Sequence, residues 1–209
     1  LKLISHLANV GDAKTLITNG AITPFISNSL AADIFGGEAL IAKSWAADDN
    51  INSPLTDSDN RNLARVAQYF SVQIDNRRDA KKYYLDSLTH YLFAMAQDSD
   101  PEGVEELSKK SKTLPFSAIA HQLGYPKVSD VNHNPLRLLA EMPLPIYITT
   151  SYHDFVEVAL SQTGRKKPVS EIFYWDDTLY PIPSIWDREP GYRPTPERPL
   201  VYHLYGLDK

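Results

Sequence analysis

The sequence contains no cysteine among its 209 residues. This absence excludes disulfide bonds, zinc sites built on thiolates and a cysteine nucleophile. A chain without disulfides suits a reducing compartment, so we expect a cytoplasmic location. The six histidines never occur at the HxxxH spacing of a helical metal site, so no metal ligand is predicted.

Basic stripes and long apolar runs are also missing. The net charge is −5 and the basic residues do not cluster, which argues against a nucleic-acid-binding protein. No window approaches 18 uninterrupted apolar residues, so no membrane-spanning helix and no membrane partner is predicted. Residues 1–25 lack a basic start followed by a long apolar stretch, so no signal peptide is predicted.

The residues that are present have the pattern of an α/β protein. Apolar residues make up 43% of the chain, enough for a sizeable core. Short apolar runs predict strands at 21–26, 145–151, 170–175 and 200–206. Residues 154–164 have the spacing of a helix that ends at Gly164. Strand, helix and strand in that order predict a parallel sheet, and therefore a Rossmann-like fold.

Helical spacing recurs in the long stretch between the first two strands. Helices are predicted at 61–73, 80–96, 116–124 and 134–143, and another at 1–10, whereas 98–113 resembles a polar surface segment. We expect a single domain over residues 1–209 with a helical module inserted at about 57–142. Because the chain stops just after a strand, we expect it to continue into further domains of a longer protein.

The first candidate site is "ITPFISNSL", residues 22–30. A strand that turns tightly into a helix is where Rossmann-like folds hold pyrophosphate. Glycine usually occupies such a turn, but here it is Ser27-Asn28-Ser29. These residues can direct N–H groups at an anion, or they can simply cap the following helix.

The second candidate is "ITTSYHDF", residues 148–155. Thr149, Thr150 and Ser151 follow a predicted strand, at the edge where open α/β sheets bind ligands. Ser151 as a nucleophile requires a base, and His153 is the local candidate. In the alternative interpretation, Ser151 caps the next helix and His153 lies on the surface.

The third candidate is "PLVYHLYG", residues 199–206. In a strand His203 and Tyr205 point to the same face, where they can act as acid, base or ribose contacts. Alternatively, neighbours satisfy both side chains in a half-buried setting. The aromatic loop 173–192 is interpreted as packing, because no basic residues are interleaved with its rings.

These blocks, in order, resemble the SIR2-like family of prokaryotic proteins over roughly residues 20–209. The resemblance implies a Rossmann-like NAD domain with a helical module. Active members cleave the nicotinamide–ribose bond of NAD, and many act in anti-phage defence. It implies catalytic positions at Ser151, Tyr205, His203 and His153. The positions implied to bind the nucleotide are Pro24, Phe25, Ser27, Asn28, Ser29, Gln68, Thr149, Thr150, Asp154 and Gly206.

At its key positions this chain departs from the family pattern. Ser27–Ser29 replaces a glycine-alanine-glycine turn, Ser151 replaces an asparagine, and Tyr205 replaces the histidine that acts as base. Serine lacks the reach of an asparagine amide, and a phenol with an unperturbed pKa near 10 is a poor base at pH 7. Losing one such group costs about 10²–10⁴ in rate, although such losses need not add.

Three hypotheses follow. In the first, the domain binds NAD or an ADP-ribose-like nucleotide, and NAD hydrolysis is lost or strongly reduced. In the second, it is an active NAD hydrolase in which His203 or His153 supplies the missing base. In the third, it is a ligand-free protein-interaction module that docks through loop 173–192. A homo-oligomer is compatible with all three. Deacylation is disfavoured, because no cysteine is present for the structural zinc that this activity implies.

Overall fold

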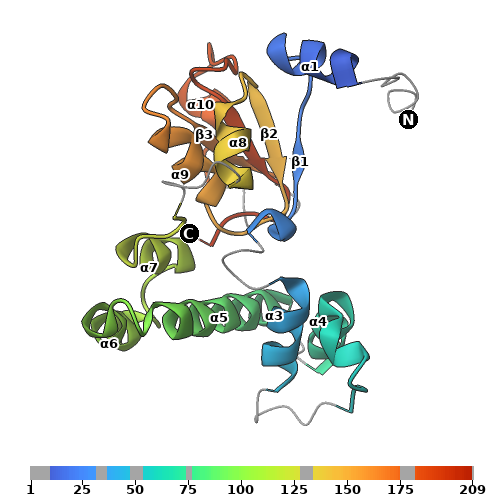
Figure 1. Ribbon diagram of the computed structural model, residues 1–209, viewed down its shortest axis with the longest axis vertical. Coiled ribbons are helices and arrows are strands. Elements are labelled where there is room, and N and C mark those ends of the chain that lie inside the picture. The colour runs from blue at the N-terminus through green and yellow to red at the C-terminus, as the bar shows by residue number, and fades with distance from the viewer. Residues whose placement is uncertain are drawn as a thin grey trace. The chain divides into compact units, whose positions relative to one another are not determined.

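The protein, as a computed structural model, divides into two compact units (Figure 1). The structure describes residues 10–31, 37–47, 54–73, 77–127, 134–174 and 182–208. One unit comprises Leu1–Ser27 and Lys127–Leu207 and is called the sheet unit below. The other comprises Asn28–Pro126 and Asp208–Lys209 and is called the helical unit. The helix predicted at 1–10 falls almost wholly outside the described residues.

The sheet unit is built on parallel strands, which confirms the predicted α/β class. Its described strands are β1 (Phe25–Ile26), β2 (Ile146–Thr149), β3 (Val169–Ile172) and β4 (Leu200–His203). They pair in the order β1-β2-β4-β3, and every pair is parallel. The strands are rich in branched and aromatic residues, which fit a pleated, buried surface. The last strand in the chain therefore lies in the interior of the sheet, beside β2.

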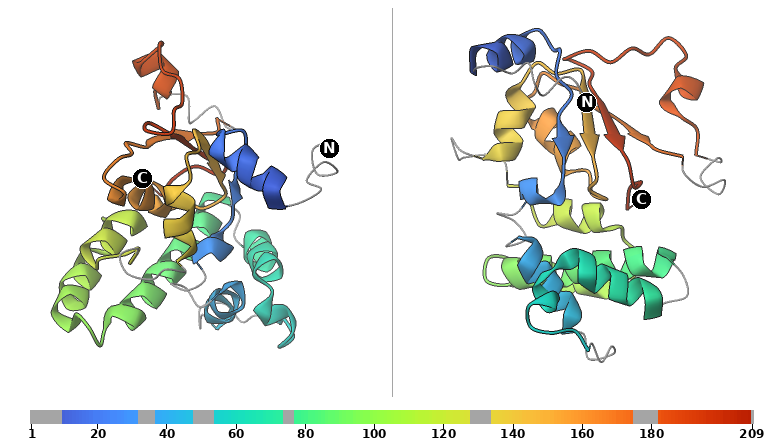
Figure 2. Two further views of the ribbon diagram at one scale, coloured as in Figure 1. Left: turned by 45° about the horizontal axis from the view of Figure 1, so that its top comes forward. Right: turned by 90° about the vertical axis from the view of Figure 1, so that its right-hand side faces the viewer.

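Helices cover both faces of this sheet (Figure 2). The helices α8 (Pro135–Glu141) and α9 (Phe155–Gln162) pack together on one face, and α10 (Ile185–Arg188) lies on the other. Helix α1 (Val10–Thr18) precedes β1 in the chain. Because side chains alternate along a strand, each strand sends residues to both faces. The α9 face includes the buried Tyr147 and Val201, whereas Leu200 packs against Ile185 and Tyr192 on the α10 face.

Local sequence explains where these helices begin and end. The side chain of Asn134 caps α8 by accepting hydrogen bonds from the N–H groups of Leu136 and Arg137. Helix α9 is followed by Gly164 at φ +70°, the left-handed conformation that glycine adopts without strain. Helix α10 was not predicted, because it is a single turn inside the proline-bearing loop. It is stabilised by a capping box between Ser184 and Asp187.

The helical unit packs around a cluster of aromatic residues. Trp45, Phe70 and Tyr84 come from three different helices, and their ring centroids lie 4.6 Å (Trp45–Phe70) and 5.8 Å (Trp45–Tyr84) apart. All three side chains are buried. The elements of this unit are η2 (Asn28–Ala31), α3 (Glu38–Ala46), η3 (Asp59–Arg61), α4 (Leu63–Gln73), α5 (Arg77–Ala96), α6 (Pro101–Lys110) and α7 (Phe116–Gln122).

The boundaries of the helical unit differ from those predicted. The unit begins at residue 28 rather than about 57, because α3 packs against α4 and α5. It ends at 126 rather than 142, because α8 packs against α9 of the sheet unit.

The segment predicted to be a polar surface contains helix α6. Val104 and Leu107, three residues apart, face inward and are buried. Asp100 caps this helix by accepting the N–H of Gly103, and Pro101 occupies its first turn. The charges on the outer face of α6 masked this short apolar stripe in the sequence. Among the described residues, no helix has the length and apolarity needed to cross a bilayer.

Candidate functional site

The last residues of the four strands lie side by side at one edge of the sheet. Ile26 pairs with Thr149, Thr149 pairs with His203, and His203 pairs with Ile172. Two predicted site residues from distant parts of the sequence, Thr149 and His203, are thereby neighbours. This row and the turns that follow it form the carboxyl edge of the sheet, the usual ligand-binding edge of open α/β folds.

The turn after β2 is held by hydrogen bonds to the neighbouring strands. Thr150 donates its N–H to the carbonyl of Ile26 at 3.0 Å, and Leu204 donates its N–H to the carbonyl of Thr149 at 2.9 Å. Within the turn, the hydroxyl of Thr149 accepts the N–H of Ser151 at 3.0 Å. Thr149 and Ser151 are both buried, so they shape the turn from the inside.

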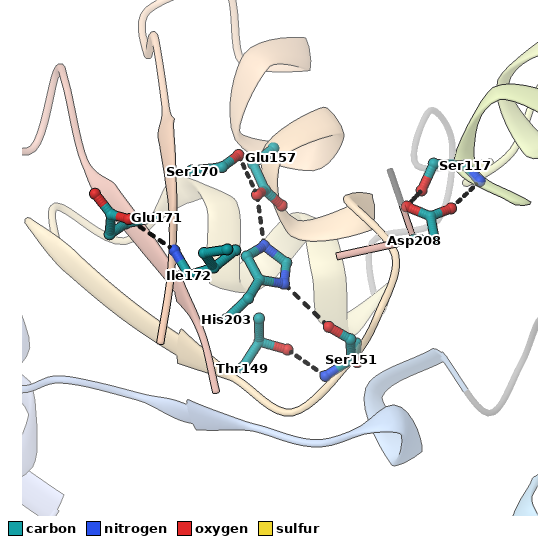
Figure 3. A network of polar contacts seen from close by, with 9 residues as sticks. All are labelled: Ser117, Thr149, Ser151, Glu157, Ser170, Glu171, Ile172, His203 and Asp208. Atoms are coloured by element: carbon teal, nitrogen blue, oxygen red, sulfur yellow. Dashed lines mark hydrogen bonds and ion pairs between the residues drawn. The ribbon is translucent and has the colours of Figure 1, made fainter. Parts of the chain in front are cut away.

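His203 lies at the centre of a buried polar network (Figure 3). Its Nδ1 lies 3.0 Å from the carbonyl of Ser151, which can only accept, so Nδ1 carries the proton of that hydrogen bond. Its Nε2 lies 2.7 Å from Oε1 of Glu157 on α9. The hydroxyl of Ser170 on β3 donates to the same Oε1 at 2.6 Å. The network therefore joins β4, β3, α9 and the turn after β2.

The surroundings of His203 favour its charged form. Burial by itself lowers the pKa, but the hydrogen bond and negative charge of Glu157 oppose that effect and outweigh it. The carbonyl of Ser151 and the charge of Asp154 act in the same direction as Glu157, and the pKa of His203 is raised above 6.5. His203 and Glu157 thus form a buried pair that favours the protonated imidazole. Both ring nitrogens are engaged, which leaves neither free to take a proton from a ligand.

The surroundings of His153 favour its neutral form instead. Its side chain is buried and stacks against Phe155, with ring centroids 4.1 Å apart. Burial, helped by the positive charge of nearby His203, lowers the pKa of His153 to about 3. The imidazole is therefore neutral at pH 7. The interpretation of His153 as a surface residue is wrong, because the turn directs its side chain inward beside the first residue of α9.

The alternative interpretation, in which Ser151 caps the following helix, is also wrong. Helix α9 begins at Phe155, so the N-cap position belongs to Asp154 and not to Ser151. Asp154 is buried, and its side chain makes no capping hydrogen bond to the first turn. It contributes its negative charge to both histidines instead, raising the pKa of each in opposition to burial.

Tyr205 does not share the face of His203, contrary to the prediction from strand alternation. Strand β4 ends at His203, and the chain then turns through the buried Gly206 at φ +80°. The turn exposes Tyr205 to 55% of its maximum, whereas His203 is fully buried. The ring of Tyr205 lies 6.5 Å from that of the half-buried Tyr152, centroid to centroid. The two tyrosines are the aromatic part of the carboxyl edge.

The remaining predicted nucleotide contacts divide between the two units. Pro24, Phe25 and Ser27 belong to the sheet unit, where the carbonyl of Pro24 pairs with β2 and the Phe25 side chain is exposed. Asn28 and Ser29 open η2, and Gln68 lies exposed on α4, all in the helical unit. The predicted roles of all these residues stay predictions.

Two polar residues of strand β3 that the sequence did not indicate as site residues take part in buried hydrogen bonds. Ser170 completes the His203 network, and Glu171 is buried on the opposite face of the sheet. The carboxylate of Glu171 accepts the Ser184 hydroxyl at 2.8 Å and the Ile185 N–H at 2.7 Å, which secures the start of α10. Alternation along "VSEI" indicates that Ser170 and Glu171 point to opposite faces of the sheet, but it does not indicate which residues they contact there.

In the part of the chain that the structure describes, no group of three or more His, Asp or Glu side chains is arranged to hold a metal ion. A scan against models of protein families finds no match for this chain, and a search of the curated proteins finds no relative. The SIR2-like resemblance therefore stays a prediction from the residues quoted above.

Proposed function

We propose that the sheet unit binds NAD or an ADP-ribose-like nucleotide at its carboxyl edge, and that hydrolysis of NAD is lost or strongly reduced. The proposed setting is a larger, defence-type prokaryotic protein in which such a domain senses or scaffolds. The fold is of the class that binds nucleotides at this edge. The observation that carries the loss of hydrolysis is that Glu157 and Ser151 engage both nitrogens of His203.

The accessible groups at the carboxyl edge suit a nucleoside. Tyr205 is exposed, and Ser27, Thr150 and Tyr152 are half-buried. The hydroxyl of Thr150 donates to the carbonyl of Ile26 at 3.4 Å, but hydroxyl oxygens can also accept from ribose hydroxyls, and the two phenol rings offer faces on which a base can stack. None of these four side chains carries an imidazole or a carboxylate. The set therefore fits recognition of a nucleotide better than the activation of water.

The same geometry weighs against a rearranged hydrolase. That hypothesis requires the imidazole of His203 or His153 to reach a ribose hydroxyl or a water within about 3 Å. The ring nitrogens of His153 are buried, and those of His203 are engaged within the network.

Binding and turnover are measured on the same preparation. We expect NAD or ADP-ribose to raise the melting temperature, because a ligand at 100 times its Kd stabilises the folded state by about 2.7 kcal/mol. We expect chromatography to detect no nicotinamide release above the buffer blank. Tyr205→Ala should weaken binding about tenfold, since base–aromatic stacking contributes about 1–3 kcal/mol. Tyr83→Ala removes an exposed tyrosine of α5 and serves as the matched control.

Two results would overturn the proposal. Nicotinamide release that is abolished by Ser151→Ala or Tyr205→Phe would establish an active hydrolase. The absence of any thermal shift with either nucleotide would instead favour the interaction module.

The interaction module is the second candidate, because large apolar side chains are exposed around loop 173–192. Phe173, Ile182 and Trp186 all have exposed side chains. If this surface mediates self-association, sedimentation will depend on protein concentration, and Trp186→Ser will remove that dependence. A single sedimenting species at all concentrations would count against a homo-oligomer formed through this loop.

A further inference from the structure

The helical unit contains a hollow that none of the preceding functions uses. Its volume is about 490 Å³, within the range of small-molecule sites. Helix α5 contributes one wall, and the segment that leads from α6 into α7 contributes another. Asp208 completes the lining.

The charged groups of this hollow include one more lysine than carboxylates. Lys81, Lys82 and Lys112 line it, against two carboxylates, Asp86 and Asp208. Three lysines and two carboxylates in the lining leave one positive charge in excess, on a chain whose net charge is −5. A local positive potential in an acidic protein attracts anions to that position.

The neutral hydroxyls of the lining already donate their protons elsewhere. The hydroxyl of Thr89 donates to the carbonyl of Leu85 at 2.8 Å. That of Ser111 donates to the carbonyl of Ser108 at 2.8 Å. Lys82 and Lys112 are exposed and can donate to a ligand, and Lys81 adds its charge beside Asp208, which favours an anion over a neutral polar molecule.

Asp208 contributes one of the two carboxylates that line the hollow. Its carboxylate accepts the backbone N–H of Ser117 and the hydroxyl of the same residue, the latter at 3.0 Å (Figure 3). It also acts on Lys81, whose pKa burial lowers and the charge of Asp208 raises. Asp208 thus places a carboxylate of the chain itself in the lining of the hollow, where its charge acts on Lys81.

We propose that this hollow binds a small phosphate-bearing molecule through Lys81, Lys82 and Lys112, and that Asp208 competes with the phosphate for the same wall. A phosphate dianion presents several acceptor oxygens, which three separate ammonium groups can contact together. A ligand with a single carboxylate would use only part of this donor set.

To test this proposal, inorganic phosphate is titrated into the full chain at constant ionic strength. Acetate is titrated in a parallel experiment. Backbone amide shifts in nuclear magnetic resonance spectra report the position and the affinity. Phosphate should shift the amides of residues 81, 112 and 117 in a saturable manner, more tightly than acetate does. Acetate binding as tightly as phosphate would overturn the assignment to phosphate.

Lysine variants locate the site. Lys82→Met and Lys112→Met remove exposed side chains, so both variants should fold, and each should weaken phosphate binding about tenfold. Lys110→Met is the matched control, because Lys110 pairs with Glu106 on α6 outside the hollow. Equal weakening by all three variants would indicate diffuse attraction and overturn the proposal.

The competing carboxylate gives a result of opposite sign. Asp208→Asn removes a negative charge from the wall, so phosphate should bind several-fold more tightly. Unchanged or weaker binding by a folded Asp208→Asn protein would refute the competition. The Tyr205→Ala variant should bind phosphate normally, so failure of this proposal and failure of nucleotide binding at the sheet are distinguishable.

Discussion

Removing the carboxylate of Glu157 tests the buried network of the sheet unit most directly. In Glu157→Ala, His203 and Ser170 both lose the acceptor that they share at 2.7 and 2.6 Å. His203 is fully buried, so water cannot replace that acceptor without a rearrangement. Breaking a buried ion pair by removing one partner costs about 3–5 kcal/mol of folding free energy. We therefore expect the melting temperature to fall by about 6–20 °C.

An isosteric variant separates the charge from the shape. In Glu157→Gln, the amide nitrogen can take the place of Oε1, donating one N–H to a neutral imidazole at His203 and the other to the hydroxyl of Ser170. We expect a loss of about 1–2 kcal/mol, because a charge-assisted hydrogen bond is roughly twice as strong as a neutral one. Glu105→Ala is the control, since that glutamate forms an exposed ion pair with Lys109 and should leave the melting temperature unchanged.

The stabilisation by the ion pair also depends on pH, with a defined sign. The pKa of His203 in the folded state is raised above 6.5, its value in the unfolded chain. The stabilisation is therefore fully present below pH 6.5 and is lost as the pH rises through the folded-state pKa. The stability difference between the parent chain and Glu157→Gln should shrink over that interval, as measured by urea denaturation. A difference that stays constant or grows as the pH rises would refute the assignment of an imidazolium at His203.

Two further predictions concern other buried side chains. The pKa of His153 is about 3 in the folded state, against 6.5 in the unfolded chain, so the free energy of unfolding should fall by about 1.4 kcal/mol for each pH unit below 6.5. In His153→Phe, the free energy of unfolding obtained from denaturation curves should depend less on pH in this acidic range. His90→Phe, at an exposed position of α5, is the control and should leave this pH dependence unchanged. Equal slopes of the free energy of unfolding against pH in the parent chain and both variants would contradict the reasoning. Trp45→Ala should lower the free energy of unfolding of the helical unit by about 3–5 kcal/mol, as measured by calorimetry, because Trp45 is buried against Phe70 and Tyr84. The side chain of Leu40 on the same helix is exposed, so Leu40→Ala should lower it far less. Similar losses for both variants would show that the aromatic cluster is not the core of that unit.

Much of the fold could be predicted because its signals are local. The apolar runs of β2 and β4 and the 3.6-residue period of α4 and α9 each lie within a short window of sequence. Gly164 and Asn134 lie where a helix end requires them. The prediction was wrong for α6 and α10, where charges or prolines masked short elements that are stabilised mainly by what they pack against.

The polar network could not be predicted, because its members lie far apart in the chain. The pairing order β1-β2-β4-β3 brings His203 beside Thr149 and under Glu157. The sequence alone indicates histidines near the ends of two strands, but it does not indicate that one is charged and the other neutral. A pKa depends on burial and on neighbouring charges, and both exist only after distant segments have packed together.

By itself, the sequence determined most of the secondary structure, the parallel α/β class and the absence of cysteine chemistry, because these depend on composition and on neighbours within a few residues. The tertiary structure decided which residues turn inward at the carboxyl edge, which charges meet there, and that Tyr205 rather than a histidine is exposed. Side-chain direction beyond the end of a strand is set by the turn and by long-range contacts, not by alternation.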